Sequence, residues 1–316
     1  MLALWILFLL FLSIAGLVMF ARFSNQKAEQ LLPPSGQFAQ LGSTKIHFLD
    51  QGTGPTILLI HGLAGNLHNF SYGVSTALSK RFRVITVDRP ACGYSTREAH
   101  ADASLEAQAD TLVELLTHLQ IESAVVVGHS LGGAISLAMA QRHPDRVKAL
   151  ALIAPLTHLP DEPSPVFKAL DVPSPWLRKV LGWTLAIPGT LYRMSVSLKV
   201  IFGPERAPSD FAIRGGGILS LKPHTFISAS TDLQNASWSM PNIEAAYANM
   251  TTPVSVLFAR EDRILDCKLN AEDLPSRIPG AQITLVNGGH MLPVTQVELT
   301  TQFIEDAAGK ATGLAP

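Results

Sequence analysis

Three residues that lie far apart in the chain carry side chains that could together break an acyl bond. The first is Ser130, in the stretch Gly128-His129-Ser130-Leu131-Gly132, which follows the β-branched run Val125–Val127 and precedes a helix-like segment. When Gly-x-Ser-x-Gly joins a strand to a helix, the turn is so tight that the serine backbone is strained and its hydroxyl is exposed. The alternative is a glycine-rich turn whose serine only caps the helix. Because both flanks fit the first arrangement, we interpret Ser130 as a candidate nucleophile.

A serine hydroxyl is a poor nucleophile near neutral pH and needs a base to take its proton. His290 is the candidate base, because imidazole titrates near the operating pH and His290 follows the strand-like run Gln282–Val286. The base in turn needs a carboxylate that fixes its tautomer and stabilises the imidazolium. Asp262 follows another such run, and Glu261 and Asp266 compete with it for this role.

The elements that would position these residues alternate between short apolar runs and helical patterns. Buried strands followed by helices predict a doubly wound, mostly parallel sheet whose ligands bind at the carboxyl ends of the strands. His61, Asp88 and Ser130 all follow such runs. The expected strands are residues 56–60, 83–87, 124–127, 147–153, 254–259 and 282–286, after a first hairpin of 37–41 and 45–49. The expected helices are residues 67–79, 104–119, 131–142, 267–276 and 295–308, with a frayed tail after Ala307.

Residues 156–250 break this alternation. Prolines crowd at positions 160, 163, 165, 173 and 175, the apolar stretches lack strand periodicity, and Gly215-Gly216-Gly217 could form a hinge. This pattern predicts a mostly helical insertion over the sheet edge, a lid. Its aromatic residues either face lipid and acyl chains or form the core of the lid itself.

The first residues of the chain are of a different kind. Met1–Ala21 contain no charged side chain, and about 20 apolar residues span the hydrocarbon core of a bilayer. We predict an uncleaved transmembrane anchor over residues 1–22 and a linker over 23–36; a cleaved signal peptide is the alternative. Arg22 and Lys27 follow the span, which favours a cytoplasmic catalytic domain.

Composition excludes several other functions. The 316 residues include 24 basic and 25 acidic side chains, for a net charge of −1, so no strong field favours nucleic acid. The two cysteines, Cys92 and Cys267, lie far apart, match no metal spacing and do not support a disulfide framework. No His/Asp/Glu cluster has metal spacing either, so we expect no metal and no cofactor.

Taken together, the motifs make the chain resemble the α/β-hydrolase superfamily over about residues 37–308. The matching pieces are His61-Gly62, the segment around Ser130, Asp262 and Gly289-His290, in the order serine, acid, histidine that this fold uses. The resemblance implies a core of residues 37–155 and 251–310 that carries the lid. The family spacing selects Asp262, although Ala259 stands where a glycine is usual.

The resemblance also implies which groups would hold the tetrahedral oxyanion. It assigns this role to the backbone N–H groups of Leu63, after His61-Gly62, and of Leu131, after the nucleophile. His61 would then shape the first of these loops, and His129 would pack against the nucleophile turn.

The segment Asp88–Ser95 resembles the corresponding segment of a subgroup that includes epoxide hydrolases, haloalkane dehalogenases, haloperoxidase-like esterases and C–C hydrolases. Ala91-Cys92 departs from the usual small residues there, and we interpret the segment as a structural brace. Dehalogenases and epoxide hydrolases of this fold use an aspartate nucleophile. Ser130 at that position instead favours acyl transfer to water.

The sequence therefore predicts a membrane-anchored serine hydrolase that cleaves a carboxylic ester, with a small hydrophobic or lipid acyl substrate. An amide, peptide-terminal or C–C bond hydrolase with the same three residues is the alternative among enzymes. From a different class, a non-catalytic binding protein on the same fold is the other alternative.

Overall fold

A single eight-stranded sheet organises the chain between residues 37 and 286. The computed structural model describes residues 1–98, 100–160 and 164–313. The strands lie in the order β1-β2-β4-β3-β5-β6-β7-β8; β2 pairs antiparallel with β1 and β4, and the other neighbours are parallel. The strands are β1 (Gln37–Leu41), β2 (Thr44–Gln51), β3 (Thr56–Ile60), β4 (Arg83–Val87), β5 (Ala124–His129), β6 (Val147–Ile153), β7 (Val254–Ala259) and β8 (Gln282–Val286). The predicted mostly parallel sheet is confirmed.

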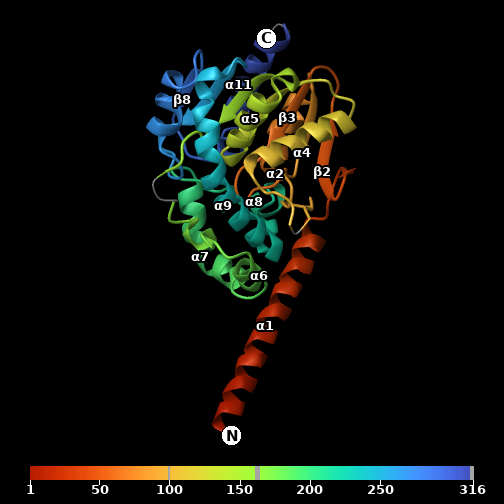
Figure 1. Ribbon diagram of the computed structural model, residues 1–316, viewed down its shortest axis with the longest axis vertical. Helices are drawn as coiled ribbons and strands as arrows, with labels where there is room; N and C mark the ends of the chain where they lie inside the picture. Colours follow the sequence, from red (N-terminus) through yellow and green to blue (C-terminus); the bar gives the residue numbers. More distant parts are fainter. Residues whose placement is uncertain (99, 161–163, 314–316) are drawn as a thin grey trace.

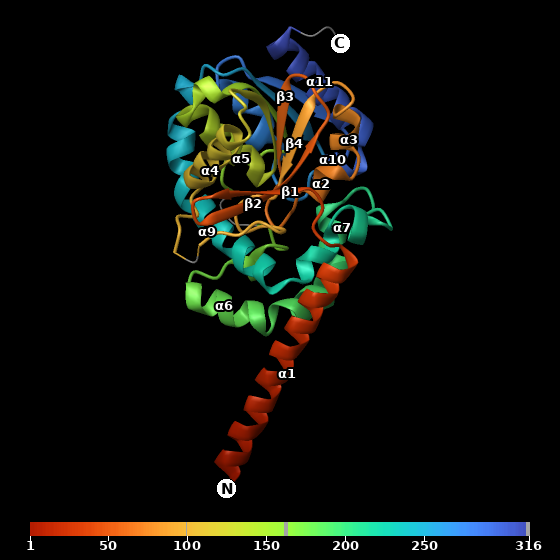
Figure 2. The same cartoon turned by 90° about the vertical axis from the view of Figure 1, so that its right-hand side faces the viewer.

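Helices cover both faces of this sheet, which explains why its central strands read as continuous apolar runs (Figure 2). On one face, α4 (Leu105–His118) and α5 (Leu131–Arg142) bury residues such as Leu112 and Ile135 in the larger core. On the other face, α3 (Val74–Leu78) and α11 (Val297–Thr312) bury residues such as Leu78 and Ile304 in the second core. In the sheet, Ile60 at the end of β3 pairs with Gly128 near the end of β5.

Of the two helices predicted in the N-terminal half, one differs from the structure and the other agrees with it. The helix expected over residues 67–79 is split into α2 (His68–Ser71) and α3, because the chain turns at Gly73 to pass Val297. A Cβ atom at Gly73 would lie 2.7 Å from a methyl group of Val297, so no larger residue fits there. The start of α4 matches its prediction: the Ser104 hydroxyl accepts a hydrogen bond from the amide of Ala107.

The C-terminal part also departs from expectation in detail. The helix expected over residues 267–276 is a π-helical turn, η5 (Lys268–Glu272), followed by the 3-10 turn η6 (Leu274–Ser276). The helix expected over residues 295–308 is α11, which begins at Val297 after a separate short helix, α10 (Leu292–Thr295), and does not fray after Ala307. It continues to Thr312 because Ala307 and Ala308 are buried against the sheet. Residues 314–316 of the expected tail lie outside the described residues.

The insertion between β6 and β7 is helical, and its described residues contain no strand. Pro175 occupies the first turn of α6, whose N-terminus is capped by the Ser174 hydroxyl. Pro163, one of the clustered prolines, lies outside the described residues. The elements, after the short turn η1 (Pro144–Arg146) that precedes β6, are η2 (Lys168–Leu170), α6 (Pro175–Trp183), α7 (Ala186–Ile201), α8 (Phe211–Arg214), η3 (Gly217–Leu221), α9 (Pro223–Ala245) and η4 (Tyr247–Asn249).

The N-terminal helix α1 (Leu2–Leu31) projects from the lid end of the molecule (Figure 1). Within the described chain it is the one helix long and apolar enough to cross a membrane. The linker expected over residues 23–36 is wrong for residues 23–31, which continue the helix. They do so because one side of α1 packs on the lid elements η3 and α6, where Ala21, Ser24 and Ala28 are buried.

Candidate active site

Ser130 occupies the turn between β5 and α5 in a strained backbone conformation. Its φ is 54° and its ψ is −121°, a region that residues with a side chain rarely adopt. The flanking glycines make this possible. A Cβ atom at Gly128 would lie 2.4 Å from the carbonyl oxygen of Gly132, and one at Gly132 would lie 2.3 Å from that of Ile60. The turn therefore requires glycine at both positions.

Backbone hydrogen bonds hold the strained turn in place. The Ser130 amide donates to the carbonyl of Ile153, and the Ser130 carbonyl accepts from the amides of Gly133 and Leu156. Its hydroxyl, by contrast, has no hydrogen-bond partner within the described part of the chain. This side chain lines a cavity instead, so its oxygen is available to a ligand.

His290 and Asp262 lie in direct contact, although they come from different strand ends. The Nδ1 atom of His290 is 2.7 Å from Oδ2 of Asp262. The other carboxylate oxygen accepts the amides of Ile264 and Leu265 at 2.7 and 3.1 Å. Because both oxygens are held and the Asp262 side chain is fully buried, this carboxylate fixes the orientation of the imidazole.

The two competing acids have other partners. Glu261 accepts a hydrogen bond from the amide of Gly288 at 2.6 Å, which ties the turn after β7 to the turn after β8. Asp266 accepts from the amide of Leu269 and caps the short turn that follows. Neither carboxylate is bonded to His290 in the described structure.

His129 connects the serine turn to the histidine turn. Its Nε2 donates a hydrogen bond to the backbone carbonyl of His290 at 2.9 Å, and the two rings lie 4.9 Å apart. Burial and the nearby His290 lower the pKa of His129 to about 3, so its ring is neutral. Among the described residues, no hydrogen bond joins the Ser130 hydroxyl to the His290 ring; such bonds are commonly long without substrate and tighten in the reacting complex.

Two backbone amides near Ser130 are free to bind an anion. Neither the Leu63 amide nor the Leu131 amide has a hydrogen-bond partner in the described residues, and both residues line the same cavity as Ser130. The loop that carries Leu63 is fixed from behind by His61. The ring of His61 accepts the amide of Arg89 at 3.1 Å, and burial together with the Arg89 charge lowers the pKa of His61 to about 3.

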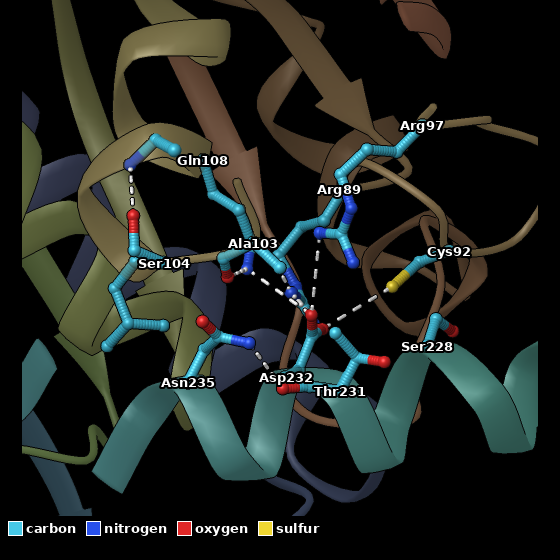
Figure 3. Close-up of polar contacts among 12 residues, drawn as sticks. Arg89, Cys92, Arg97, Ala103, Ser104, Gln108, Ser228, Thr231, Asp232 and Asn235 are labelled. Carbon is cyan, nitrogen blue, oxygen red and sulfur yellow. Dashed lines mark hydrogen bonds and ion pairs between the residues drawn. The ribbon is translucent and has the colours of Figure 1, made fainter. Parts of the chain in front are cut away.

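Arg89 links this loop to the lid, a connection that the sequence did not indicate. Its guanidinium donates to the carbonyl oxygens of His61 and Gly62, both at 3.0 Å. The same group donates at 2.7 Å to Gln108 on α4 and at 2.7 Å to Asp232 on the lid helix α9. Figure 3 shows the Asp232 side chain pointing from α9 toward Arg89 and Gln108.

The surroundings of this ion pair exclude water. The side chains of both Arg89 and Asp232 are fully buried, and Arg97 lies 3.8 Å from the second oxygen of Asp232. Cys92 also faces Asp232, and burial raises the pKa of its thiol to about 12. We call Arg89, Gln108 and Asp232 the lid tie.

Asp88 supports the sheet edge and does not face the cavity. Its carboxylate accepts the amides of Leu67 and Tyr94 and lies 2.7 Å from Nδ1 of His47. Burial by itself would raise the pKa of Asp88, but His47 and the Leu67 amide outweigh it and hold the pKa below its usual value. This arrangement agrees with the structural role expected for the segment.

The cavity over Ser130 is small and mostly apolar. It has a volume of about 150 Å³ and lies between the sheet and the lid. Leu63 and Leu131 line its floor beside Ser130, and Leu233 from α9 reaches it from the lid. The remaining apolar side chains that line it include Leu156, Leu159, Phe167, Ile264 and Leu265.

Comparison with known proteins agrees with this fold. Residues 55–200 match the family model described as alpha/beta hydrolase fold. An uncharacterised protein of Mycobacterium tuberculosis is 27% identical over 86% of this chain and 82% of its own length. No reaction is named for this relative.

Solved structures with a similar fold include several named hydrolases. A membrane phospholipase A, described as a bacterial virulence factor, superposes with a TM-score of 0.72 at 21% identity, over 98% of this chain and 99% of its own. A thermophilic esterase from Thermogutta terrifontis gives 0.68 at 25% identity, over 87% and 99%. A meta-cleavage product hydrolase gives 0.66 at 21% identity, over 87% and 98%. The neighbours thus include hydrolases of more than one bond type.

Proposed function

Because the chain belongs to the α/β-hydrolase superfamily, we propose that it is a membrane-anchored serine hydrolase that cleaves carboxylic esters through an acyl-enzyme on Ser130. The observation that carries this proposal is the strained Ser130, whose side chain lines an apolar cavity and whose neighbour His129 is hydrogen-bonded to the turn that carries the buried His290–Asp262 pair. An aspartate nucleophile, which would imply alkyl transfer, is absent from this position.

The geometry supports the following reaction. The Ser130 hydroxyl attacks the ester carbonyl carbon while Nε2 of His290 takes its proton, and Asp262 stabilises the resulting imidazolium. The tetrahedral oxyanion accepts hydrogen bonds from the amides of Leu63 and Leu131, which have no other partner in the described structure. The intermediate collapses, the C–O bond to the alcohol breaks, and the alcohol leaves with the proton from His290.

Hydrolysis of the acyl-enzyme repeats these steps with water. His290 takes a proton from a water molecule, whose oxygen attacks the acyl carbon. The second tetrahedral intermediate then releases the carboxylic acid, and Ser130 recovers its proton. The apolar lining of the cavity supports a small hydrophobic acyl group or the end of a lipid chain as the substrate.

Helix α1 supports the membrane part of the proposal. Its length and apolar composition suit a span, and Arg22 and Lys27 at its C-terminal side favour a cytoplasmic catalytic domain. Extraction tests this directly. An anchored protein stays with membranes in carbonate and high salt and leaves only with detergent; release by carbonate alone would indicate a cleaved leader or a peripheral protein.

Active-site labelling tests the catalytic part. The full chain should react covalently with a fluorophosphonate probe, and Ser130→Ala should abolish this reaction and lower ester turnover on the order of 10⁴-fold. His290→Ala should lose comparable activity. Asp262→Asn should lose activity too, while the matched change Asp266→Asn should lose little. Labelling of the Ser130→Ala variant would place the nucleophile elsewhere.

A substrate panel separates esters from the other bond types. Aryl esters of increasing acyl length, matched amides and a vinylogous C–C substrate should be compared at equal concentration. We expect ester cleavage to dominate. Turnover of the C–C substrate alone would favour the alternative reaction, and the absence of both labelling and turnover would favour a non-catalytic binding protein.

A further inference from the structure

Helices α6 and α7 expose an unusual amount of apolar surface for a water-soluble domain. In α6 only Arg178 and Gly182 are buried, and in α7 only Ala186 and Ile187. We call the exposed apolar surface of the two helices the α6–α7 face. Its main members are Trp176 (71% exposed), Trp183 (40%), Leu185 (56%), Leu191 (42%), Tyr192 (88%) and Val196 (58%).

This face also carries positive charge and no negative charge. Between Asp171 and Glu205 the chain contains no acidic residue. Lys179, Arg193 and Lys199 are all exposed there. Exposed tryptophan and tyrosine beside basic residues are typical of surfaces that rest in the headgroup region of a bilayer, where the rings are half-solvated and the cations meet lipid phosphates.

Helices α6 and α7 lie at the end of the molecule from which α1 projects, as Figure 1 and Figure 2 both show. The direction of α1 is fixed by its packing on the lid. The half-buried Leu17 and the buried Ala21, Ser24 and Ala28 form one stripe along α1, which contacts η3 and α6.

Polar contacts add to this packing at the C-terminal end of α1. Glu29 lies 3.0 Å from Nζ of Lys222, a buried side chain at the start of α9. That ammonium group lies over the ring of Tyr94 at 4.0 Å, and the Tyr94 hydroxyl donates to the carbonyl of Leu32. The anchor is therefore docked on the domain and does not hang from a flexible linker.

The length of α1 then sets the height of the lid above a membrane. Leu2–Ile14 are all exposed, and partial burial begins at Ala15–Leu17. Residues 2–14 are about 20 Å long at a helical rise of about 1.5 Å, whereas the hydrocarbon core of a bilayer is about 30 Å thick. The free part of α1 is thus too short to cross the core alone.

The outer side of α1 supplies the missing length. Met19, Phe20 and Phe23 stay exposed alongside the lid, and the polar residues Asn25, Gln26 and Lys27 follow. The apolar surface of α1 therefore ends beside the domain and not below it. A bilayer that covers this surface must also reach the lid elements that pack against α1.

We propose that the α6–α7 face docks into the headgroup region of a phospholipid bilayer, with a preference for anionic lipids. This inference rests on the anchor in the proposed function and specifies how the lid contacts the membrane. The alternative partner for this apolar face is a second copy of the chain. The test below distinguishes the bilayer from a second copy.

The four tryptophans of the chain are suitable reporters. Trp5 lies in the free part of α1, Trp176 and Trp183 lie on the α6–α7 face, and Trp238 lies elsewhere on the lid. Trp238 is the matched control because it is at least as exposed as Trp176, at 79%, but lies on the part of α9 that packs against the core. The hydroxyl of its neighbour Ser239 accepts a hydrogen bond from the Leu105 amide at the start of α4. Four variants that each keep one tryptophan and replace the other three with phenylalanine isolate these signals.

Each full-length variant is reconstituted into vesicles of phosphatidylcholine and phosphatidylglycerol whose acyl chains are brominated near the glycerol end. Bromine quenches tryptophan only on contact. We expect the emission of Trp176 and Trp183 to fall as strongly as that of Trp5, more so as the phosphatidylglycerol fraction rises, while the emission of Trp238 is unchanged.

The outcomes distinguish the two proposals. If Trp5 is quenched while Trp176 and Trp183 respond as little as Trp238, the proposal that the α6–α7 face docks on the bilayer is overturned and the anchor is kept. A second copy of the chain that covers the face gives this result. Absence of quenching at all four positions would overturn both. Quenching of Trp176 and Trp183 without Trp5 would support the docked face and reject the spanning helix.

Discussion

The lid tie makes a quantitative prediction about stability. Asp232 and Arg89 are both fully buried, with 2.7 Å between the carboxylate oxygen and the guanidinium nitrogen. Asp232→Ala leaves the Arg89 charge buried with no counterion at that distance. Breaking a buried pair in this way costs about 3–5 kcal/mol, a large share of the roughly 5–15 kcal/mol by which domains are stable. The midpoint of thermal unfolding should fall by roughly 10 °C.

The control is an exposed ion pair of the same length. Asp110 and Arg142 also lie 2.7 Å apart, but their side chains are 37% and 46% exposed. Because solvent screens such a pair, Asp110→Ala should cost at most about 1 kcal/mol. Both variants are measured by thermal and urea unfolding of the full chain in detergent.

A double variant tests whether the ion pair itself is responsible. Asp232→Leu combined with Arg89→Met removes both charges and should recover part of the loss. Recovery is incomplete because Arg89 also binds the carbonyls of His61 and Gly62. If Asp232→Ala lowers the midpoint no further than Asp110→Ala, the lid tie does not stabilise the fold as argued.

Three further changes have expected outcomes. Gly132→Ala should destabilise the chain by about 1–3 kcal/mol and abolish probe labelling, because its methyl group would lie 2.3 Å from the Ile60 carbonyl oxygen; Gly189→Ala, where nothing lies within 4 Å, should retain labelling and gain about 0.5–1 kcal/mol. Ser104→Ala removes a helix cap and should cost about 1 kcal/mol in urea unfolding; no change would mean that the cap is replaced by water. His129 has a pKa of about 3 when folded and about 6.5 when unfolded, so the unfolded chain binds the extra proton between these values and stability falls as pH is lowered through that window. His129→Gln should reduce this slope by about 1.4 kcal/mol per pH unit, and an unchanged slope would show that the ring is already protonated in the fold.

The sheet could be predicted well from the sequence because its strands are local signals. Thr56–Ile60 and Arg83–Val87 are continuous apolar runs between turn residues, and the structure gives them the predicted bounds. The serine turn was equally clear, since glycines on both sides and a strand before it leave few alternatives. These features depend on residues close together in the chain.

The errors and omissions involve residues that are distant in the sequence. Arg89 and Asp232 are separated by 143 positions, and Asp232 stands in a polar stretch that is typical of a solvated helix face. Gly73, at the break in the predicted helix, packs against Val297 from the distant C-terminal helix. Residues 23–31 lead to Pro33-Pro34, which favour a linker, but small residues at Ser24 and Ala28 let the helix pack on the lid.

The position of β8 at the edge of the sheet makes the two halves of the candidate site unequal in local stability. Every residue of β5 is buried, whereas no residue of β8 is, and β8 has a partner on one side only. Local opening is cheapest where backbone hydrogen bonds face solvent and few apolar contacts must be broken. We therefore expect the strand that leads to His290 to open locally before β5, which carries Ser130. The hydrogen bond from His129 to the His290 carbonyl opposes this opening, and brief opening would leave a protein that is folded but transiently without its candidate base.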